Sequence, residues 1–431
     1  MAEPKENIVM FPFMAQGHII PFLALALHIE KTKSFTITFV NTPLNIKKLK
    51  SSIPPDSSIK LLEIPFNSSD HGLPPNSENT DILPYPLIIS LLHASTSLKP
   101  AFKTLIEDII EEQEAVLVDL VWLAITLSGQ RFLIEGVDSD EFELKDFKEA
   151  SRFHVSQLPL SILAADGSDS WSVFQRMNLP AWVDSNGILF NTVEEFDQLG
   201  LMYFRKRLGR PAWAIGPVLL SVDHRARAGK QSGISADFLK NWLDTKPVSS
   251  VLYVSFGSNN TISTSQMMQL ALALEGSGKN FIWVVRPPIG FDINSEFKDR
   301  EWLPEGFEER IKDSGRGLLV QKWAPQVEIL SHKSICAFLS HCGWNSVLEA
   351  LNNGVPLLGW AMAGEQFFNV KFLEERVGEK GKEMRRKASE VKEMIRNAIR
   401  DEDGFKGSSV KELDDFFQAA MVMRDGADHK A

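Results

Sequence analysis

Short apolar runs alternate with segments of helical character along the first part of the chain, and this alternation constrains the fold more than any other feature. The expected strands are Ile8–Phe13, Ser34–Val40, Ser58–Phe66 and Ala115–Leu120. The expected helices between them are Phe22–Glu30, with Pro21 in its first turn, and Leu87–Glu112, broken near Pro100. Strands that alternate with helices favour a parallel sheet with helices on both faces.

The alternation weakens after Arg131 and restarts beyond Ala214–Gly233, a stretch with Gly, Pro and basic residues that is typical of a linker. Further strands are expected at Val251–Phe256, Phe281–Val285, Gly317–Gln321, Ile335–Ser340 and Val355–Gly359, and further helices at Ser265–Leu274, Asn345–Asn352 and Gln366–Val377. We therefore predict the α/β class, as two doubly wound domains in tandem. The predicted bounds are 1–216 for the N-terminal domain, 217–234 for the linker, 235–378 for the C-terminal domain and 379–431 for C-terminal helices.

Composition argues against several classes of protein. Apolar residues make up 44% of the 431 residues and charged residues 24%, which is ordinary for a soluble globular protein. The net charge of -10 argues against a nucleic-acid partner. The two cysteines, Cys336 and Cys342, form neither a disulfide framework nor a zinc pattern, and they favour a reducing, cytoplasmic setting. The opening apolar run is too short and too interrupted to span a membrane.

The stretch ICAFLSHCGWNS is typical of a buried strand, a glycine turn and the start of a helix. Such a junction gathers free backbone N–H groups and the positive end of the helix dipole, which suits a phosphate. His341 and Ser346 can add side-chain donors, and Asn345 and Ser346 are good helix-capping residues. Taken alone, the stretch is more often a capped turn without a ligand, with His341 as an ordinary turn residue.

Four residues on the flanks of this stretch are suited to a nucleotide sugar. Trp323 follows a strand and can stack on a flat base, while Glu349 can accept two ribose hydroxyls. Glu365 and Gln366 start a helix, where they can bind sugar hydroxyls. Each has a structural alternative: a core position for Trp323, a solvated charge for Glu349, and first-turn capping for the last two.

The stretch WAPQVEILSHKSICAFLSHCGWNSVLEALNNGVPLLGWAMAGEQ, from Trp323 to Gln366, resembles the signature box of plant UDP-dependent glycosyltransferases of family 1. The resemblance continues in FMAQGHIIP, GILFNTVEEFD, IGPV and VLYVSFGS. It implies a GT-B fold of two facing Rossmann-like domains. It also implies transfer of a sugar, usually glucose from UDP-glucose, to a small hydrophobic acceptor such as a flavonoid or phenolic, with inversion and without a metal or other cofactor. We expect a cytoplasmic monomer.

The resemblance assigns donor-binding roles to residues of this chain in three groups. Those for the uracil base and the ribose are Trp323, Ala324, Gln326 and Glu349. Those for the diphosphate are Ser258, His341, Asn345 and Ser346. Those for the sugar are Trp344, Glu365 and Gln366, and Gln at this last position leans toward glucose.

An acceptor hydroxyl needs a base before it can attack C1 of a sugar. A histidine near its ordinary pKa of about 6.5 can take that proton. His18 follows the first strand and Gly17, and the resemblance implies that it is this base. Asp119, after the strand AVLV, is implied to orient His18 and to stabilise its charged form. On its own, a histidine in such a place is more often an ordinary core or turn residue.

The chain is shorter than the family pattern in two places. After about residue 127 it passes almost directly into LIEGVDSDEFELKDF, where the family continues through a helix and a strand. Near Val377–Lys382 the helix after the box joins the C-terminal helix, where the family has a strand and another helix. We therefore predict deletions in both domains, the first beside the acceptor pocket.

These deletions leave a second hypothesis open, a truncated nucleotide-sugar-binding homologue with impaired catalysis. A nicotinamide-dependent enzyme is not favoured, because no G-x-G-x-x-G follows the first strand of either domain.

Overall fold

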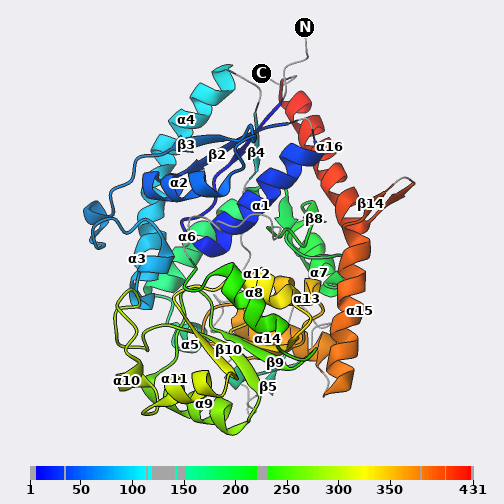
Figure 1. The fold of residues 1–431 in the computed structure, drawn as a ribbon. Coiled ribbons are helices and arrows are strands. Elements are labelled where there is room, and N and C mark those ends of the chain that lie inside the picture. The colour runs from blue at the N-terminus through cyan, green and yellow to red at the C-terminus, as the bar shows by residue number, and fades with distance from the viewer. Residues whose placement is uncertain are drawn as a thin grey trace. The chain divides into compact units, whose positions relative to one another are not determined.

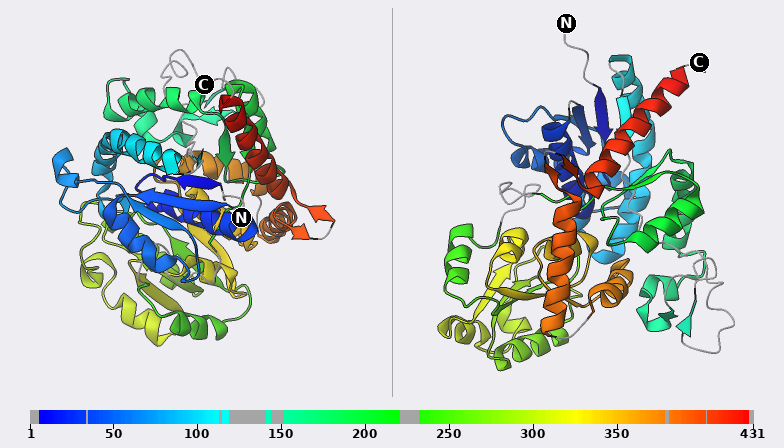
Figure 2. Two further views of the ribbon diagram at one scale, coloured as in Figure 1. Left: turned by 90° about the horizontal axis from the view of Figure 1, so that it is seen from above. Right: turned by 90° about the vertical axis from the view of Figure 1, so that its right-hand side faces the viewer.

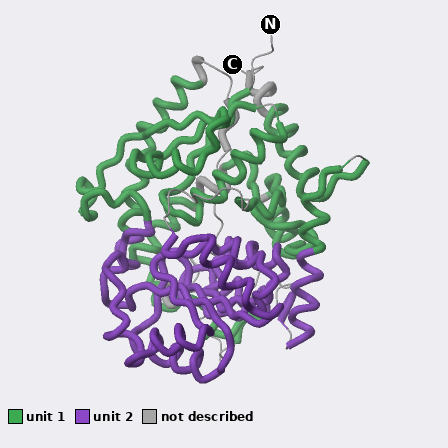
Figure 3. Tube along the Cα trace, in the orientation of Figure 1, with its two compact units in different colours: residues 1–79, 89–229, 393–431 green, residues 80–88, 230–392 purple. Residues whose placement is uncertain are grey.

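The computed structural model describes residues 6–33, 35–112, 115–118, 141–143, 152–220, 232–378, 381–402 and 404–428. The chain forms two compact units (Figure 3). Unit 1 comprises Met1–Asn79, Ile89–Gly229 and Glu393–Ala431, and unit 2 comprises Thr80–Ile88 and Lys230–Lys392. The chain therefore passes between the units four times, and the predicted linker at 217–234 contains one of these passages.

Unit 1 contains a parallel sheet of four strands in the order β3-β2-β1-β4 (Figure 1). These strands are β1 (Asn7–Met10), β2 (Thr36–Asn41), β3 (Lys60–Glu63) and β4 (Ala115–Val118). Every residue of β1 is buried, as expected when both faces of a parallel sheet are covered. The chain adds β2 and β3 on one side of β1 and then returns to add β4 on the other side. This order is that of a doubly wound sheet, which confirms the predicted fold of this domain.

The remaining elements of unit 1 are mostly helices. They are α1 (Gln16–Thr32), α2 (Pro43–Leu49), α4 (Lys99–Glu112), α5 (Leu160–Leu163), α6 (Ser170–Asp184), α7 (Gln198–Leu208) and α16 (Ser408–Asp428). Helix α3 (Tyr85–Ser95) begins in unit 2 and continues in unit 1. Two short antiparallel pairs are β5 (Glu141–Phe142) with β6 (Phe153–His154), and β14 (Asp401–Glu402) with β15 (Phe405–Lys406).

A separate pair of parallel strands, β7 (Ile188–Phe190) and β8 (Ala212–Ala214), shares the core of unit 1. Leu189 of β7 and Trp213 of β8 belong to the same buried cluster as Phe39 of β2. Helix α16 contacts both β8 and β4. Within the described residues no strand joins β4 to β7, so side-chain packing, rather than one continuous sheet, connects the two parts of this unit.

The start of α1 differs from the sequence prediction. We expected the helix to begin at Phe22, after a turn that carries His18, but α1 begins at Gln16. Ala15 is its N-cap in an extended conformation, and the backbone N–H of His18 bonds to the carbonyl oxygen of Ala15 at 2.9 Å. Pro21 lies inside the helix as its sixth residue, where it cannot donate the usual backbone bond to the residue four positions earlier. His18 therefore stands in the first helical turn.

Unit 2 contains a parallel sheet of five strands in the order β11-β10-β9-β12-β13. Its strands and helices are drawn mainly in green to orange in Figure 2. The strands are β9 (Val251–Ser255), β10 (Asn280–Val285), β11 (Gly317–Gln321), β12 (Ile335–Ser340) and β13 (Leu357–Gly359). The helices are α8 (Ala236–Asp244), α9 (Thr264–Gly276), α10 (Asp299–Trp302), α11 (Phe307–Asp313), α12 (Gln326–Ser331), α13 (Trp344–Asn352) and α14 (Gln366–Val377). The strand order reverses between β9 and β12, which is the switch point of a doubly wound sheet.

Two buried clusters cover the two faces of the unit 2 sheet. Successive side chains of a strand point to opposite faces. Accordingly, Tyr253 of β9 and Ile282 of β10 belong to one cluster, while Val254 and Trp283 belong to the other. Both faces are thus packed, which confirms the predicted doubly wound arrangement of this domain.

The C-terminal part of unit 2 passes directly from one helix to the next. Helix α14 ends at Val377 and α15 (Lys382–Ala398) follows, with no strand among the described residues between them. This succession agrees with the second predicted deletion, whereas the first, after about residue 127, lies outside the described residues. In the part of the chain that the structure describes, no helix is both long and apolar enough to cross a membrane.

Candidate functional site

The loops that follow β9 and β12 meet at the switch point of unit 2. The two strands are neighbours, and Ser255 pairs with Ser340 at their carboxyl ends. The loop after β9 contains Gly257 and Ser258, and the loop after β12 begins with His341. Ligands of doubly wound sheets bind at this point. The fold therefore brings Ser258 and His341, which are far apart in the sequence, to the place where a ligand is expected.

The imidazole of His341 lies between two glycines. A Cβ atom added to Gly257 would stand 2.5 Å from Nε2 of His341, and one added to Gly343 would stand 2.6 Å from it. Gly257 also has φ +79°, a conformation that favours glycine. Only residues without a side chain therefore let both loops approach the ring this closely.

The same imidazole is neutral and incompletely hydrogen-bonded. His341 is 9% exposed, and burial lowers its pKa to about 4, so the ring is uncharged at neutral pH. Its Nδ1 is buried without a hydrogen-bond partner among the described residues. Buried polar atoms without a partner are rare in folded proteins, and hydrogen bonding to a ligand is one way to satisfy such an atom.

Cys342 adopts a left-handed backbone conformation at this turn. Its φ is +62°, which is uncommon for a residue with a side chain, and it is fully buried. The backbone N–H of Cys342 donates to Oγ of Ser340 at 3.0 Å, and Nδ2 of Asn369 donates to its carbonyl oxygen at 2.9 Å. Burial raises the pKa of the Cys342 thiol to about 12, so it is not a nucleophile at neutral pH. This role of Cys342 in the turn was not predicted from the sequence.

Helix α13 begins without a side-chain cap. Its first residue is Trp344, and its N-cap is Gly343. The prediction that Asn345 and Ser346 cap this helix is therefore wrong, because both lie inside its first turn. The uncapped N–H groups and the positive end of the helix dipole favour an anion at this point.

Gln326, at the start of α12, joins two of the predicted nucleotide-binding residues. Its Nε2 donates to Oγ of Ser346 at 3.0 Å and to Oε2 of Glu349 at 2.8 Å. Its Oε1 accepts from the hydroxyl of Tyr253 at 3.1 Å. Glu349 is 5% exposed, so the alternative that it is a solvated helix charge is wrong. Tyr253 was missed by sequence reasoning, because an apolar strand gives no sign of what the hydroxyl of its tyrosine contacts.

Trp323 and Ala324 connect β11 to α12. Lys322 has φ +67° and turns the chain directly after β11. The carbonyl oxygen of Trp323 accepts from the backbone N–H of Gly233 at 2.8 Å. Ala324 is 3% exposed, whereas Trp323 is only partly buried. Trp323, whose indole ring is partly exposed, is thus separated from Gln326 by only a short turn.

Glu365 and Gln366 lie at the start of α14, as its N-cap and its first residue. Oε1 of Gln366 accepts from the backbone N–H groups of Met362 and Ala363, both at 3.0 Å, so a ligand would meet its amide nitrogen. Burial raises the pKa of Glu365 to about 7, opposed by hydrogen bonds from its own backbone N–H and that of Trp344. The indole of Trp344 packs edge-on against Phe372 on α14 at 6.0 Å.

The predicted base, His18, lies in unit 1. Its ring packs edge-on against Phe13, with the ring centroids 5.5 Å apart, and burial lowers its pKa to about 4. Strands β1 and β4 are neighbours, and Met10 pairs with Val118 at their carboxyl ends. The predicted partner Asp119 directly follows Val118 but lies outside the described residues.

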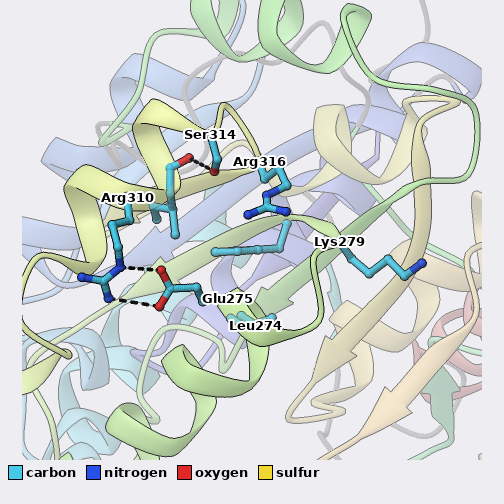
Figure 4. A pocket seen from close by; sticks show the side chains of 8 residues that line it. Leu274, Glu275, Lys279, Arg310, Ser314 and Arg316 are labelled. Carbon is cyan, nitrogen blue, oxygen red and sulfur yellow. Dashed lines mark hydrogen bonds and ion pairs between the residues drawn. The ribbon is translucent and has the colours of Figure 1, made fainter.

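A small surface hollow in unit 2 is not part of this site (Figure 4). It lies at the amino ends of β10 and β11, whereas the predicted residues follow the carboxyl ends of the strands. Its lining residues are Leu274, Glu275, Lys279, Phe281, Arg310, Ile311, Ser314 and Arg316. Glu275 accepts two hydrogen bonds from Arg310, at 2.6 and 3.0 Å.

Known proteins are similar to this chain in both sequence and fold. The family model described as UDP-glucoronosyl and UDP-glucosyl transferase matches residues 217–413. UDP-glycosyltransferase 92A1 of Arabidopsis thaliana is 48% identical over 491 aligned positions, covering 98% of this chain and 99% of that protein. Crocetin glucosyltransferase 3 of Crocus sativus is 39% identical, covering 86% and 85%. The crystal structure of Glycyrrhiza uralensis UGT73P12, complexed with glycyrrhetinic acid 3-O-monoglucuronide, covers 99% and 98% at 25% identity, with a TM-score of 0.82.

The alignment with the Arabidopsis protein is longer than the chain itself. It has 491 positions and the chain has 431 residues, so at least 60 positions (491 − 431) hold no residue of this chain. This difference agrees with the predicted deletions. The relatives are transferases by name, so the comparisons do not favour the hypothesis of a homologue that only binds nucleotide sugars. This chain is a member of the plant UDP-dependent glycosyltransferases of family 1, and it has their GT-B fold of two Rossmann-like units.

Proposed function

We propose that this protein transfers glucose from UDP-glucose to a hydroxyl of a small hydrophobic acceptor, such as a flavonoid or another phenolic, with inversion at C1. The observation that carries the proposal is the uncapped start of α13 at the switch point of unit 2, beside the neutral imidazole of His341. An anion suits this place. The name of the Crocus sativus relative supports glucose as the sugar.

The diphosphate is the leaving group, and negative charge grows on it as the sugar departs. Donors for this charge are the N–H groups at the start of α13, the side chains of Ser258, Asn345 and Ser346, and the imidazole of His341. Donors fixed in place before the reaction stabilise such charge most effectively. The glycines around His341 support a fixed ring position. We infer that these donors suffice without a metal ion, which an assay in the presence of a chelator tests.

The nucleoside half of the donor is assigned to Trp323, Ala324, Gln326 and Glu349. The amide of Gln326 donates to Oε2 of Glu349 at 2.8 Å and orients this carboxylate. We assign the ribose hydroxyls to Glu349, because a carboxylate accepts hydrogen bonds on both of its oxygens. The partly exposed indole of Trp323 supports stacking on the uracil.

The sugar is assigned to Trp344, Glu365 and Gln366. Because the pKa of Glu365 is about 7, its carboxyl group is partly protonated at neutral pH and can both donate to and accept from hydroxyl groups. The amide nitrogen of Gln366 adds a donor beside it. These groups match a neutral hexose, and Gln366 is the reason for preferring glucose.

The acceptor is activated by His18 in this proposal. Its imidazole is neutral at pH 7 and can take the proton of the acceptor hydroxyl. The acceptor oxygen then bonds to C1 on the face opposite to UDP, while the bond between C1 and the diphosphate oxygen breaks. One displacement inverts the configuration at C1. The carboxylate of Asp119 would stabilise the imidazolium that forms.

Three further properties belong to the same proposal: the protein works in the cytoplasm, as a monomer, and without a nucleic-acid partner. We infer the cytoplasmic location from two cysteines that form no disulfide framework, and the lack of a nucleic-acid partner from the net charge of -10. Light scattering of the purified protein tests whether it is a monomer.

The test is turnover of UDP-glucose and UDP-galactose with a panel of flavonols and simple phenols. We expect β-glucosides, identified by mass spectrometry and by the NMR coupling at the anomeric carbon. An α-glucoside would contradict inversion, and faster use of UDP-galactose would contradict the sugar. Binding of UDP by calorimetry, without product from any acceptor, would favour the impaired homologue instead.

A further inference from the structure

Asn41, the last residue of β2, is fully buried, and its side-chain amide joins two segments of unit 1. Its Nδ2 donates to the carbonyl oxygen of Pro12 at 2.8 Å, and its Oδ1 accepts from the backbone N–H of Thr42 at 3.0 Å. Strands β1 and β2 are parallel neighbours, so the carboxyl end of β2 lies beside the loop that follows β1. The amide therefore ties this loop to the neighbouring strand.

The loop that Asn41 holds connects β1 to α1 and contains Phe13. Because a peptide group is planar, the bond to the carbonyl oxygen of Pro12 also fixes the backbone N–H of Phe13. The next peptide group is held as well, since the carbonyl oxygen of Phe13 accepts from the backbone N–H of Ala15 at 2.7 Å. Both peptide groups that flank Phe13 are thus hydrogen-bonded within unit 1.

Phe13 packs directly against the proposed base. Its ring and the imidazole of His18 lie edge-on, with the ring centroids 5.5 Å apart and the planes at 76°. The backbone N–H of His18 bonds to the carbonyl oxygen of Ala15 at 2.9 Å. Packing against a neighbour that is itself held restricts a side chain to fewer orientations. The loop therefore positions both the backbone and the ring of His18.

These contacts form a connected path from Asn41 through Pro12 and Phe13 to His18. A general base must lie within hydrogen-bond reach of the proton that it takes. A displacement of about 1 Å, caused by a substitution away from the reacting atoms, can lower a rate by about 10²-fold. The orientation of the loop therefore matters for transfer even though Asn41 itself is fully buried.

We propose that Asn41 is a positioning residue for His18: its amide holds the peptide group between Pro12 and Phe13, and the Phe13 ring in turn orients the imidazole toward the acceptor hydroxyl. This inference rests on the proposed function, because His18 is the base there. It gives a part in transfer to a buried residue of the sheet that acts only through its neighbours.

The experiment compares glucosyl transfer by Asn41→Asp with transfer by the parent from pH 5.5 to pH 9. A protonated carboxyl group has nearly the shape of the amide and can still donate to Pro12, whereas a carboxylate has no donor. Burial favours the protonated form at the lower pH. The ratio of the two kcat values should therefore be close to one at pH 5.5 and lower by about 10- to 10²-fold at pH 9. UDP affinity should stay within about twofold of the parent, since the donor residues lie in unit 2.

Asn41→Ala removes both hydrogen bonds at every pH. Its kcat should be lower than that of the parent by about 10- to 10²-fold throughout, at a temperature where circular dichroism shows a folded protein. Asn7→Ala is the matched control. Asn7 is also buried, and its Oδ1 accepts from Oγ1 of Thr38 at 3.0 Å, but it lies at the amino end of β1, away from the loop. This control should keep the parental kcat.

Parental kcat in folded Asn41→Ala, or in Asn41→Asp at pH 9, would overturn the inference, and so would an equal loss of kcat in Asn7→Ala. If Asn41→Ala does not fold, Asn41→Asp decides. Failure of the proposed function has a different signature: the parent forms no glucoside, or His18→Ala transfers at the parental rate.

Discussion

The two units begin with the same strand order and then diverge. In unit 2 the sheet continues beyond the switch point through β12 to β13. In unit 1 the four-stranded sheet reaches β4, and β7 and β8 pair in a sheet of their own among the described residues. A strand between β4 and β7 would make one continuous sheet, and the Arabidopsis relative has at least 60 positions (491 − 431) that this chain lacks. The sheet of the donor half is thus continuous among the described residues, whereas the two sheets of the acceptor half are joined by packing of side chains.

The largest expected effect comes from a substitution in the acceptor half, unit 1, that impairs transfer without affecting the donor half. His18→Ala removes the proposed base, so we expect the rate of glucosyl transfer at saturating substrates to fall by about 10² to 10⁴-fold. UDP affinity should stay at the parental value, because the donor residues lie in unit 2. Initial rates and calorimetry measure the two effects. His71→Ala, another ring in unit 1 that stacks on Phe66, is the matched control. Transfer at the parental rate by His18→Ala would show that another group is the base.

The next effect concerns the stability of the donor half. The pKa of Glu365 is raised from 4.5 to about 7 on folding, so between these pH values the folded state binds more protons than the unfolded state. The free energy of unfolding therefore falls as the pH rises through this window, by at most about 3 kcal/mol. Glu365→Gln has no charge to desolvate and should be more stable than the parent at pH 8 by up to that amount, with little difference at pH 4.5.

Urea unfolding of both proteins at pH 4.5 and pH 8 measures this difference. Glu308→Gln, on the exposed side of α11, is the matched control and should not reproduce it. A difference between Glu365→Gln and the parent that stays constant with pH would contradict burial of an ionisable carboxyl group at this position.

A smaller effect tests whether the position of the His341 ring matters for binding at the proposed diphosphate site. Gly343→Ala places a Cβ atom 2.6 Å from Nε2 of His341, so the ring or the loop must move at a cost of about 1–3 kcal/mol. UDP affinity should fall about tenfold. Gly276→Ala is the matched control, because a Cβ atom there meets nothing within 4 Å. If calorimetry gives parental UDP affinity for Gly343→Ala, the position of His341 does not matter for the nucleotide.

The smallest effect tests the link between the sheet core and the nucleotide residues. Tyr253→Phe removes the hydrogen bond to Gln326 and should lower the free energy of unfolding by about 1 kcal/mol. The amide of Gln326 then loses one fixed orientation, so UDP affinity should fall a few-fold. Urea unfolding and calorimetry measure both changes. Loss of stability without any change in UDP affinity would mean that this hydroxyl supports only the core.

The parts of the fold that follow local pattern were predictable from the sequence. Strands β11 and β12 and helix α14 have the predicted bounds, because apolar runs and turn residues mark their ends. The predicted start of α1 was wrong, because Pro is typical of a first helical turn, whereas Pro21 lies inside this helix. Local pattern also does not show the backbone conformation of Cys342, which the buried turn around it determines.

The site was predictable where a motif carries it and not where distant segments meet. The resemblance brought Gln326, Ser346 and Glu349 into one list, and the structure links them by hydrogen bonds. The contacts of Tyr253 and of the segment Thr80–Ile88 were missed, because they join parts of the chain that no local periodicity connects. Thr80 and Asn259, for example, are hydrogen-bonded across 179 positions of sequence.

The interleaving of the two units means that no single cut can separate them. A single cut between residues 221 and 231 would leave Thr80–Ile88 of unit 2 on one fragment, and α16 of unit 1 on the other. Within unit 1 the two fragments would still share the contact of Trp213 with Phe416, and the hydrogen bond from the backbone of Ala214 to Glu412. A nicked chain should therefore run as two bands under denaturing conditions and as one particle under native conditions, and neither fragment alone contains a whole unit.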